Sequence, residues 1–258
     1  MSELSDAARE ACAAIAALLR DAHHIVALSG AGISTESGIP DFRGPQGVWT
    51  RDPEAEKRAT LQHYMANPEA RANAWRNRLA SPMFAAEANA GHRALADIAA
   101  RTHFDLLVTQ NIDGLHQKGG FPSDRVVEIH GTMHEFVCMG CGERGDIRRV
   151  LKRVEAGESD PPCRTCGGVL KSATISFGQQ LVAADLERAM HAAERADLFL
   201  GIGTTLGVYP AANMPIAALR HGAALVILNA QETPFDEYAT AIVREPLGLV
   251  LPAIAASL

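Results

Sequence analysis

The sequence predicts an α/β protein, with a Rossmann-like parallel sheet covered by helices on both faces, plus a small zinc-ribbon and helical insertion domain. Three observations lead to this prediction. Apolar runs of strand length alternate with helical segments, a glycine turn follows the first apolar run, and two C-x-x-C pairs interrupt the alternation. A chain of 258 residues is long enough to bury one large core and one smaller core.

The elements are expected in the following order. Residues 1–22 mix charged and apolar residues and predict an amphipathic helix, and the continuous apolar run at 25–28 predicts a buried parallel strand. A proline near the first turn favours a helix at 68–79. The remaining strands are predicted at 104–108, 126–129, 173–177, 197–202 and 224–228, and the remaining helices at 89–100, 181–195 and 211–220.

The composition is that of a globular protein, with 47% hydrophobic and 21% charged residues. A net charge of -6 argues against nucleic-acid binding through general basicity. Because residues 1–22 carry charges such as Asp6 and Arg20, we expect no signal peptide or membrane span there, and a cytoplasmic location. Four of the five cysteines form C-x-x-C pairs, which suits a reducing compartment, and Cys12 is expected in the core.

The first strand ends at Gly30-Ala31-Gly32, where the missing Cβ atoms let the backbone turn tightly and approach an anion such as a pyrophosphate. The third glycine of the G-x-G-x-x-G fingerprint would fall at Thr35, so a standard dehydrogenase site is not predicted. For the two glycines alone, an ordinary surface loop remains an alternative. The next stretch, Gly38-Ile39-Pro40-Asp41-Phe42-Arg43, concentrates a proline, a carboxylate, an aromatic ring and a guanidinium, which is typical of a functional loop.

Cys138 and Cys141 form one C-x-x-C pair, and Cys163 and Cys166 form a second pair after 21 intervening residues. Four thiolates at this spacing complete a tetrahedral shell around one zinc ion and leave no position for water, which predicts a structural metal. A redox site would need only one such pair. His134 lies near the first pair, and we expect it to be a loop histidine and not a ligand.

A zinc ribbon is also compatible with a nucleic-acid-binding module. Between residues 143 and 171, however, seven basic residues stand against five acidic ones, and no aromatic residue is interleaved with them. This excess of positive charge is too small for binding driven by phosphates, so we expect no direct nucleic-acid partner.

Polar residues follow several predicted strands at their carboxyl ends, the edge where open α/β sheets bind ligands. The strand at 104–108 leads into Gln110-Asn111-Ile112-Asp113, and the strand at 126–129 leads into His130, a candidate general base. Each residue alone also fits a structural role, His130 as a surface histidine and Asp113 as a helix cap. Their shared position favours a site, to which the two later strands add Gly203, Thr204, Thr205, Asn229 and Gln231.

Together these motifs resemble those of the sirtuins, the NAD-dependent protein-lysine deacylases. Three positions depart from the usual family residues: Gln179 replaces Glu, Thr205 replaces Ser, and Gln231 stands where an acidic residue is common. The resemblance covers nearly the whole chain and rests on residues 30–34, 38–43, 109–113, 115–116, 130–132, the paired cysteines, 177–178 and 203–206.

The resemblance implies an NAD-dependent protein-lysine deacetylase, which transfers the acyl group from lysine to ADP-ribose and releases nicotinamide. NAD would be the co-substrate, one structural zinc ion would be bound, and acyl-lysine proteins or peptides would be the partners. The implied division is a Rossmann-like NAD-binding domain (1–43, 88–135 and 172–258), a helical insertion with the cofactor loop (44–87) and a zinc ribbon (136–171).

The resemblance also assigns roles to single residues. His130, Asn111 and Asp113 would be catalytic, with His130 as the base that activates a ribose hydroxyl. Phe177, Gly178 and Val208 would hold the peptide as an added strand. The implied NAD contacts are Gly30, Ala31, Gly32, Ile33, Asp41, Phe42, Arg43, Trp49, Gln110, Asn111, Ile112, Asp113, Gly203, Thr204, Thr205, Asn229 and Gln231.

Two other functions stay open: an ADP-ribosyltransferase that uses the same cleavage of NAD, and a non-catalytic sensor of NAD or acyl-lysine. For the acyl group, family members that prefer succinyl-lysine or malonyl-lysine carry Tyr and Arg three residues apart in the helical insertion. The nearest segment here is Trp75-Arg76-Asn77-Arg78, in which an indole replaces the phenol and Trp75 also fits a core position. A pocket without a placed cation favours acetyl over succinyl.

Overall fold

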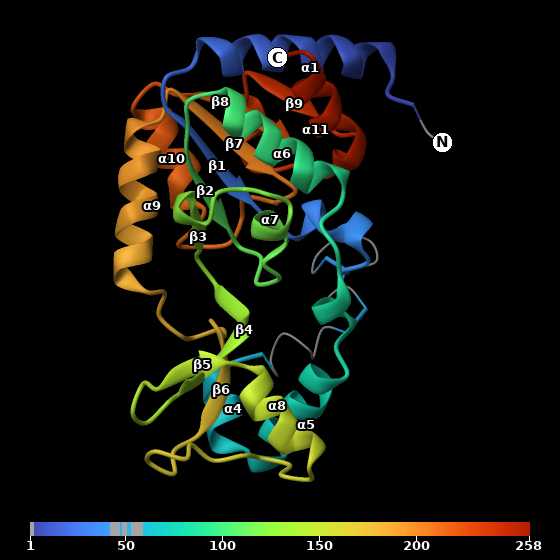
Figure 1. The fold of residues 1–258 in the computed structure, drawn as a ribbon. Coiled ribbons are helices and arrows are strands. Elements are labelled where there is room, and N and C mark those ends of the chain that lie inside the picture. The colour runs from blue at the N-terminus through green and yellow to red at the C-terminus, as the bar shows by residue number, and fades with distance from the viewer. Residues whose placement is uncertain (1–2, 42–46, 48–50, 53–58) are drawn as a thin grey trace.

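The computed structural model describes residues 3–41, 47, 51–52 and 59–258. Its larger part is a six-stranded sheet in the order β3-β2-β1-β7-β8-β9, in which every neighbouring pair is parallel (Figure 1). The strand order reverses between β1 and β7, which is where open α/β sheets bind ligands. The strands are β1 (Ile25–Ser29), β2 (Phe104–Thr109), β3 (Val126–Glu128), β7 (Leu198–Ile202), β8 (Ala224–Leu228) and β9 (Ala241–Val243).

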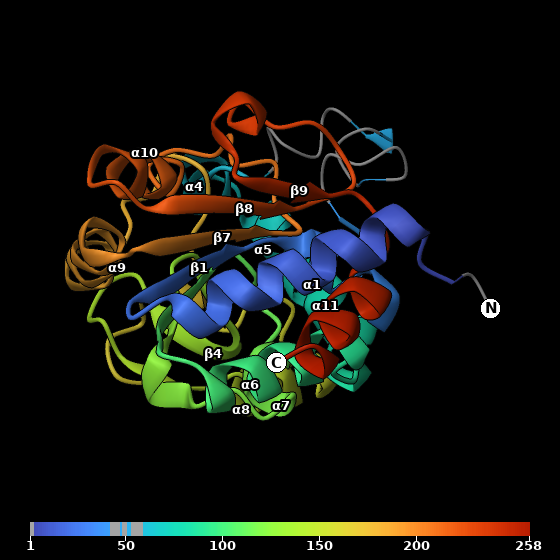
Figure 2. The same cartoon turned by 90° about the horizontal axis from the view of Figure 1, so that it is seen from above.

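Helices cover both faces of this sheet because both faces of its strands are apolar. Ile25 and Ala27 of β1 belong to one core, and Val26 and Leu28 belong to a second core on the other face. Figure 2 shows the strands between the two helical layers. The prediction of a parallel sheet with helices on both faces is confirmed. The first core takes up α1 (Asp6–Asp21), α6 (Ala90–Arg101) and α11 (Leu247–Ala256), and the second takes up α9 (Ala183–Arg195) and α10 (Asn213–Arg220).

A second, antiparallel sheet has β4 (Gly131–Cys138) between β5 (Arg144–Asp146) and β6 (Leu170–Thr174). It lies in the lower part of Figure 1 with α4 (Leu61–Ala66), α5 (Pro68–Leu79) and α8 (Arg148–Glu155). Its core centres on Trp75, Phe136 and Leu170 and is separate from the two cores of the large sheet. We call this sheet and its three helices the small module.

The prediction of a strand at 173–177 in the parallel sheet is wrong, both in the position of the strand and in the sheet to which it belongs. β6 ends at Thr174 and runs antiparallel to β4, with Leu170 opposite Cys138. The cause is the pair of C-x-x-C turns, which bring the chain that follows Cys166 back beside the chain that precedes Cys138. Phe177 lies beyond β6 and forms a single parallel bridge with Thr60.

The predicted helices are present, with small shifts at their ends. α5 spans the predicted residues, and Asn67 caps it by accepting hydrogen bonds from the backbone N–H groups of Glu69 and Ala70.

Cys12 is 1% exposed in the first core, as predicted. In the described part of the chain, no helix has both the length and the apolar character to cross a membrane. The boundaries of the three domains stay a prediction. The short helices are η1 (Ala31–Ile33), η2 (Thr35–Ser37), η3 (Pro82–Ala85), α7 (Leu115–Lys118), η4 (Ser123–Arg125) and η5 (Asp236–Tyr238).

Candidate active site and metal centre

The turn that follows β1 packs directly against the turn that follows β7. Gly32 N donates to Gly203 O at 2.9 Å. A Cβ added at Gly30 would lie 2.8 Å from Gly203 O, and one added at Gly32 would lie 2.7 Å from Gly203 Cα. Both glycines are therefore required by the contact between two backbones, whether or not an anion also approaches them.

Buried polar side chains gather at the carboxyl edge of the large sheet. Burying polar groups is unfavourable unless each finds a partner, so such a cluster in an otherwise apolar sheet indicates a site for a polar ligand. Most of the predicted strand ends contribute to it. The buried members are Ser29, Ser34, His92, Thr109, Asn111, Asp113, His116, Thr204 and Asn229.

Asn111 and Gln110 join the ends of three strands. Asn111 Nδ2 donates to Gly30 O at 3.1 Å and to Ser34 Oγ at 3.2 Å, which links the segments after β1 and β2. Gln110 Nε2 donates to Thr204 Oγ1 at 2.8 Å, which links β2 to β7. The structure therefore brings together side chains that are far apart in the sequence.

Ser34 connects Asp113 to His92, two residues that belong to different elements. Ser34 Oγ donates to Asp113 Oδ2 at 2.8 Å. His92 Nδ1 accepts from Asn89 N at 3.3 Å, so the ring proton is on Nε2, which lies 3.4 Å from Ser34 Oγ and donates to it. Burial lowers the pKa of His92 to about 4, so the ring is neutral at pH 7. A neutral imidazole thus orients the hydroxyl that holds Asp113.

His116 lies beside this group, with its ring centroid 5.0 Å from that of His92. Ser29 Oγ donates to Thr109 Oγ1 at 2.9 Å, so His116 Nε2, 2.9 Å from Ser29 Oγ, must be the donor to Ser29. His116 Nδ1 is then unprotonated, and it has no partner among the described residues. Burial, with His92 as a second cause, lowers the pKa of His116 to about 3.

His130 follows β3 and faces the segment after β2. Its Nδ1 lies 3.2 Å from Gln110 O. A carbonyl oxygen can only accept a hydrogen bond, so Nδ1 carries the proton and Nε2 carries the lone pair of a base. Burial lowers the pKa of His130, which keeps the ring neutral at pH 7. Near it, burial and the charge of Asp113 raise the pKa of Glu128 to about 7.

The residues predicted for the far end of the edge follow β8. Asn229 Nδ2 donates to Gln231 O at 3.0 Å, and Arg244 Nη1 donates to the same carbonyl at 2.6 Å. Thr205 follows β7 and is half-buried. Arg244 was not predicted, because nothing in its sequence neighbourhood connects it with this edge.

The predicted residues around the first turn have different surroundings. Ala31 and Ile112 are half-buried, whereas Ile33 is 1% exposed and packs its side chain into the first core. The side chain of Ile33 is therefore not available to a ligand. Asp41 is half-buried, and Phe42, Arg43 and Trp49 lie outside the described residues.

The predicted peptide-binding residues lie after β6 and after β7. Phe177 N donates to Ala59 O at 3.1 Å, and Phe177 O accepts from Leu61 N at 2.9 Å, so these backbone groups pair with the chain where it enters α4. Gly178 is exposed and Val208 is half-buried. A strand added here would use backbone groups other than those of Phe177.

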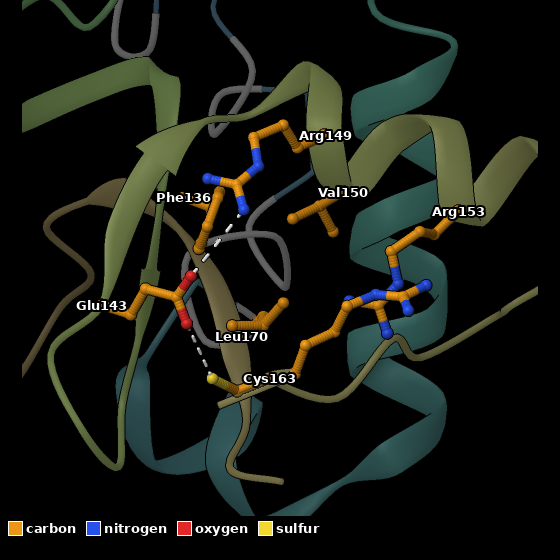
Figure 3. Close-up of a pocket in the computed structure, with 8 residues that line it drawn as sticks. Phe136, Glu143, Arg149, Val150, Arg153, Cys163 and Leu170 are labelled. Atoms are coloured by element: carbon orange, nitrogen blue, oxygen red, sulfur yellow. Dashed lines mark hydrogen bonds and ion pairs between the residues drawn. The ribbon is translucent and has the colours of Figure 1, made fainter. Parts of the chain in front are cut away.

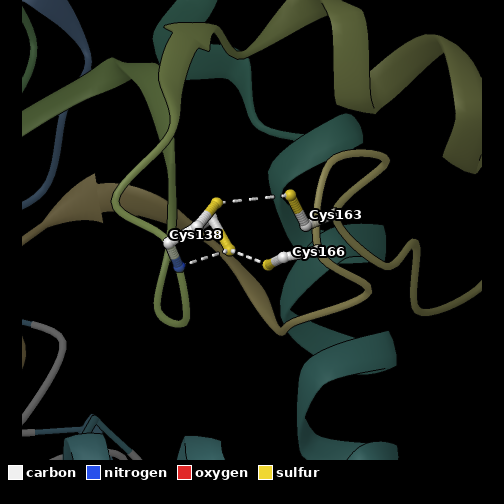
Figure 4. A group of neighbouring side chains, drawn as sticks. Cys138, Cys163 and Cys166 are labelled. Carbon is white, nitrogen blue, oxygen red and sulfur yellow. Dashed lines mark hydrogen bonds between the residues drawn. The ribbon is translucent and has the colours of Figure 1, made fainter.

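The four predicted cysteine ligands lie together in the small module. All four Sγ atoms lie within 4.8 Å of one another, and Figure 4 shows the side chains converging. Cys138 Sγ lies 3.5 Å from Cys166 Sγ, and Cys141 Sγ lies 3.8 Å from Cys163 Sγ. Four sulfurs at Zn–S distances of about 2.3 Å form a tetrahedron with edges of about 3.8 Å, so this donor set fits one zinc ion. His134 lies on β4, not in a loop, and its Nε2 donates to Asp113 O at 2.9 Å.

A cavity of about 60 Å³ lies beside Cys163 (Figure 3). Glu143 lies between Cys163 Sγ, which is 3.2 Å from one carboxylate oxygen, and Arg149, which is 3.9 Å from the other. Arg153 and Arg164 both pair with Glu158. Each of these arginines has a carboxylate partner, although Arg153 and Arg164 share one, and the polar groups of the cavity lie beside the metal centre.

The carboxyl edge also fits a dinucleotide. Its glycine turns bring two backbones to one place, and its buried hydroxyl, amide and carboxylate groups suit ribose and nicotinamide. Ser29, Ser34, His92 and His116 were not predicted as site residues, although Ser29 and Ser34 lie within the glycine-rich stretch. The spacing of Asn89 and His92, which form a capping box, was the available signal for His92.

Comparison with known proteins agrees with this arrangement. The model of the Sir2 family matches residues 30–210. The NAD-dependent protein deacetylase 2 of Streptomyces coelicolor is 50% identical over 230 residues, which cover 89% of this chain and 95% of the relative. The NAD-dependent protein deacetylase of Sulfolobus acidocaldarius is 41% identical over 241 residues, which cover 93% of this chain and 92% of the relative.

Solved structures show the same likeness. A structure of Sir2 bound to an acetylated peptide matches with a TM-score of 0.83 and 31% sequence identity. The match covers 94% of this chain and 96% of the Sir2 chain. A second structure, from work on the mechanism and regulation of Sir2 enzymes, matches with a TM-score of 0.86 and 35% sequence identity. The match covers 96% of this chain and 98% of that chain. With the paired cysteines and the polar strand ends in place, the chain belongs to the Sir2 family.

Proposed function

We propose that this chain is an NAD-dependent protein-lysine deacetylase, which transfers the acyl group from lysine to ADP-ribose with release of nicotinamide. The relatives named above are NAD-dependent protein deacetylases, and related structures contain acetylated or propionylated peptides. NAD is the co-substrate, and one zinc ion bound by the four cysteines is structural. We also assign the protein to the cytoplasm, where a reducing environment keeps the zinc ligands as thiolates.

The observation that carries this proposal is the contact between His130 Nδ1 and the Gln110 carbonyl oxygen. The Gln110 carbonyl holds the proton on Nδ1, so Nε2 can take a proton from a ribose hydroxyl at the carboxyl edge. A site that only binds NAD or acyl-lysine needs no such base. His130 therefore favours catalysis over a sensor.

We assign the remaining residues by their places at the edge. Asn111 and Asp113, held by Ser34, orient the nicotinamide and its ribose. Bound NAD supplies an electrophilic ribose carbon once nicotinamide leaves. The side chains after β7 and β8 position the adenosine end, and the glycine turns face the pyrophosphate. The full set of assigned contacts is Gly30, Ala31, Gly32, the backbone of Ile33, Asp41, Gln110, Asn111, Ile112, Asp113, Gly203, Thr204, Thr205, Asn229 and Gln231. Phe42, Arg43 and Trp49 lie outside the described residues and are assigned from the family resemblance alone.

We infer that an acyl-lysine peptide adds as a strand between the segment after β6 and the segment after β7. Phe177, Gly178 and Val208 would contact it, and exposed Gly178 offers backbone groups on one side. The acyl-lysine then has to reach His130 from the side opposite to NAD. Such an arrangement would hold the two reactants in line.

Mass spectrometry of an acetyl-peptide incubated with the protein, with and without NAD, tests the proposal. We expect a peptide lighter by one acetyl group, together with nicotinamide and O-acetyl-ADP-ribose, only when NAD is present. His130→Ala should lose this activity, and the matched control His191→Ala, which changes an exposed histidine of α9, should keep it. ADP-ribose attached to a protein instead would support the transferase, and no turnover of either kind would support the sensor.

A further inference from the structure

A carboxylate lies against one of the four cysteines that can hold zinc in the small module. Glu143 comes two residues after Cys141, and its Oε2 lies 3.2 Å from Sγ of Cys163, on the other C-x-x-C turn. Figure 3 shows the carboxylate between Cys163 and Arg149. Among the described residues, the group that can hold a metal ion consists of the four cysteines. Glu143 is therefore a neighbour of the metal centre and not a ligand.

Groups other than Cys163 hold Glu143 in this position. Thr165 Oγ1 donates to the same carboxylate oxygen at 2.7 Å, and Arg149 Nη2 lies 3.9 Å from the other oxygen. The guanidinium of Arg149 in turn lies over the ring of Phe136, 5.6 Å from its centroid. The carboxylate therefore stays beside Cys163 even when Cys163 offers it no hydrogen bond.

Two hydrogen-bond acceptors of the same charge face each other here when zinc is bound. A cysteine bound to zinc is a thiolate, which can only accept a hydrogen bond, and an ionised carboxylate can also only accept. Two other sulfurs have the opposite kind of neighbour. Gly140 N donates to Cys138 Sγ at 3.4 Å, and Gly168 N donates to Cys166 Sγ at 3.4 Å. Cys163 differs from these two ligands because it faces a negative charge.

We propose that Glu143 makes Cys163 the ligand at which the zinc ion is released. In this step the bond between Cys163 Sγ and zinc breaks, the sulfur keeps the electron pair, and a donor atom of an incoming ligand takes its place on the metal. Repulsion by the carboxylate favours this step at Cys163, and Arg149 offsets part of the repulsion. The cavity of about 60 Å³ beside Cys163 has room for the incoming donor group.

Glu143 is thus a positioning residue that acts through Cys163 and weakens the retention of zinc. The inference depends on the zinc site and not on the proposed deacetylation, so failure of one leaves the other unaffected.

The rate at which the zinc-loaded full chain transfers zinc to the chelator pyridylazoresorcinol tests this proposal. In Glu143→Gln, an amide nitrogen in the place of Oε2 can donate to the thiolate and to Thr165 Oγ1 together. We expect this variant to release zinc about tenfold more slowly than the wild type, since outer-shell partners of metal ligands have effects of this size. Arg149→Gln should release zinc about twofold to fivefold faster. The matched control Glu155→Gln, which removes an exposed carboxylate of α8, should leave the rate unchanged.

Labelling of the unmodified, zinc-loaded chain with iodoacetamide provides an independent measurement. Cys163 and Cys138 are equally well buried, at 3% and 1% exposed, so burial does not distinguish them. Among chains that carry a single label, peptide mass spectrometry should find Cys163 labelled more often than Cys138, and Glu143→Gln should remove this preference.

Zinc release from Glu143→Gln at the wild-type rate, or faster, would overturn the proposal, because Glu143 would then act only by holding Thr165. Equal labelling of Cys163 and Cys138 in the wild type would overturn it as well.

Discussion

The large sheet and the small module are stabilised in different ways. Every residue of β1 is buried, and the two cores of the large sheet take up helices on both faces. The small module has three short strands, one core around Trp75 and four cysteines in one cluster. Burial of apolar surface is sufficient to stabilise the large sheet, whereas the core of the small module is too small to stabilise it alone. The small module is therefore expected to depend on the zinc ion that its four cysteines can hold.

The two regions also differ in their buried polar groups. At the carboxyl edge, Ser34 and Asn111 each contact more than one partner. In the small module, Trp75 Nε1 and Arg78 lack an acceptor and a carboxylate among the described residues. A connected network positions groups for chemistry, while an unpaired buried group costs stability.

Removal of zinc should produce the largest difference in stability between the two regions. Structural zinc sites contribute on the order of 10 kcal/mol, so Cys141→Ala or a strong chelator should unfold the small module and abolish deacetylation. Hydrogen exchange with metal analysis should show lost protection in β4, β5 and β6 and retained protection in β1 and β7. A chain without zinc, or a quadruple cysteine variant with full activity, would contradict this.

His130→Ala should affect the chemistry of the large sheet and leave its stability intact. Removal of a general base should lower kcat/KM by roughly 10² to 10⁴-fold while NAD affinity, measured by calorimetry, largely survives. Since burial lowers the pKa of His130, the neutral base is lost only as pH falls below its ordinary value of about 6.5. An equal loss of NAD affinity and activity would make His130 a binding residue.

The acyl preference tests whether a cation of the small module reaches the active site. Arg78 donates to Ser172 Oγ, a neutral group, so we expect its guanidinium not to be placed at the acyl group. Burial of an unpaired carboxylate should make succinyl-lysine roughly 10²-fold poorer than acetyl-lysine in kcat/KM on matched peptides. Comparable rates for the two peptides would show that Arg78 or another cation reaches the pocket. Arg78→Gln should leave the ratio unchanged.

His116 should make the large sheet sensitive to acid. The unfolded chain binds a proton here below about pH 6.5. The folded chain does so only near its lowered pKa of about 3. Stability from this group is therefore complete above pH 6.5 and is lost as pH falls towards 3. From pH 7 to 5 the loss should be about 2 kcal/mol.

Urea unfolding of wild type and His116→Gln at the two pH values measures this loss. The variant should show the smaller fall, and an equal fall would mean that the folded ring takes up the proton. Glu128 acts in the opposite direction, because its raised pKa of about 7 adds stability as pH falls from 7 towards its unfolded value. Glu128→Gln should therefore make the chain more sensitive to acid.

The parts of the fold that local patterns determine could be predicted from the sequence. The apolar runs at 25–28 and 224–228 and the two C-x-x-C pairs each carry their information within a few residues. β6 could not be placed, because its partner is selected by cysteines on both sides of a long connection. β9 has only three residues, Ala241–Val243, which is too short for a periodic pattern.

The supporting residues of the site were missed for the same reason. Ser29 and His116 are 87 positions apart, and Arg78 and Ser172 are 94 positions apart, so neither contact has a local signature. Gly30 and Gly32 were predicted from a tight turn and an approaching anion, and not from a contact between two backbones. Their contact with Gly203 appears only when β1 and β7 are neighbours.

The hydrogen bond from His130 to Gln110 O has a consequence for how this site tolerates mutation. The acceptor is a main-chain carbonyl, which every amino acid carries. The tautomer of His130 therefore depends on the position of the backbone and not on the side chain at position 110. A substitution at Gln110 changes the contact with Thr204 and leaves that carbonyl in place. In a mutational scan, substitutions at position 110 should therefore leave the tautomer of His130 unchanged. Only substitutions that move the end of β2 should alter it.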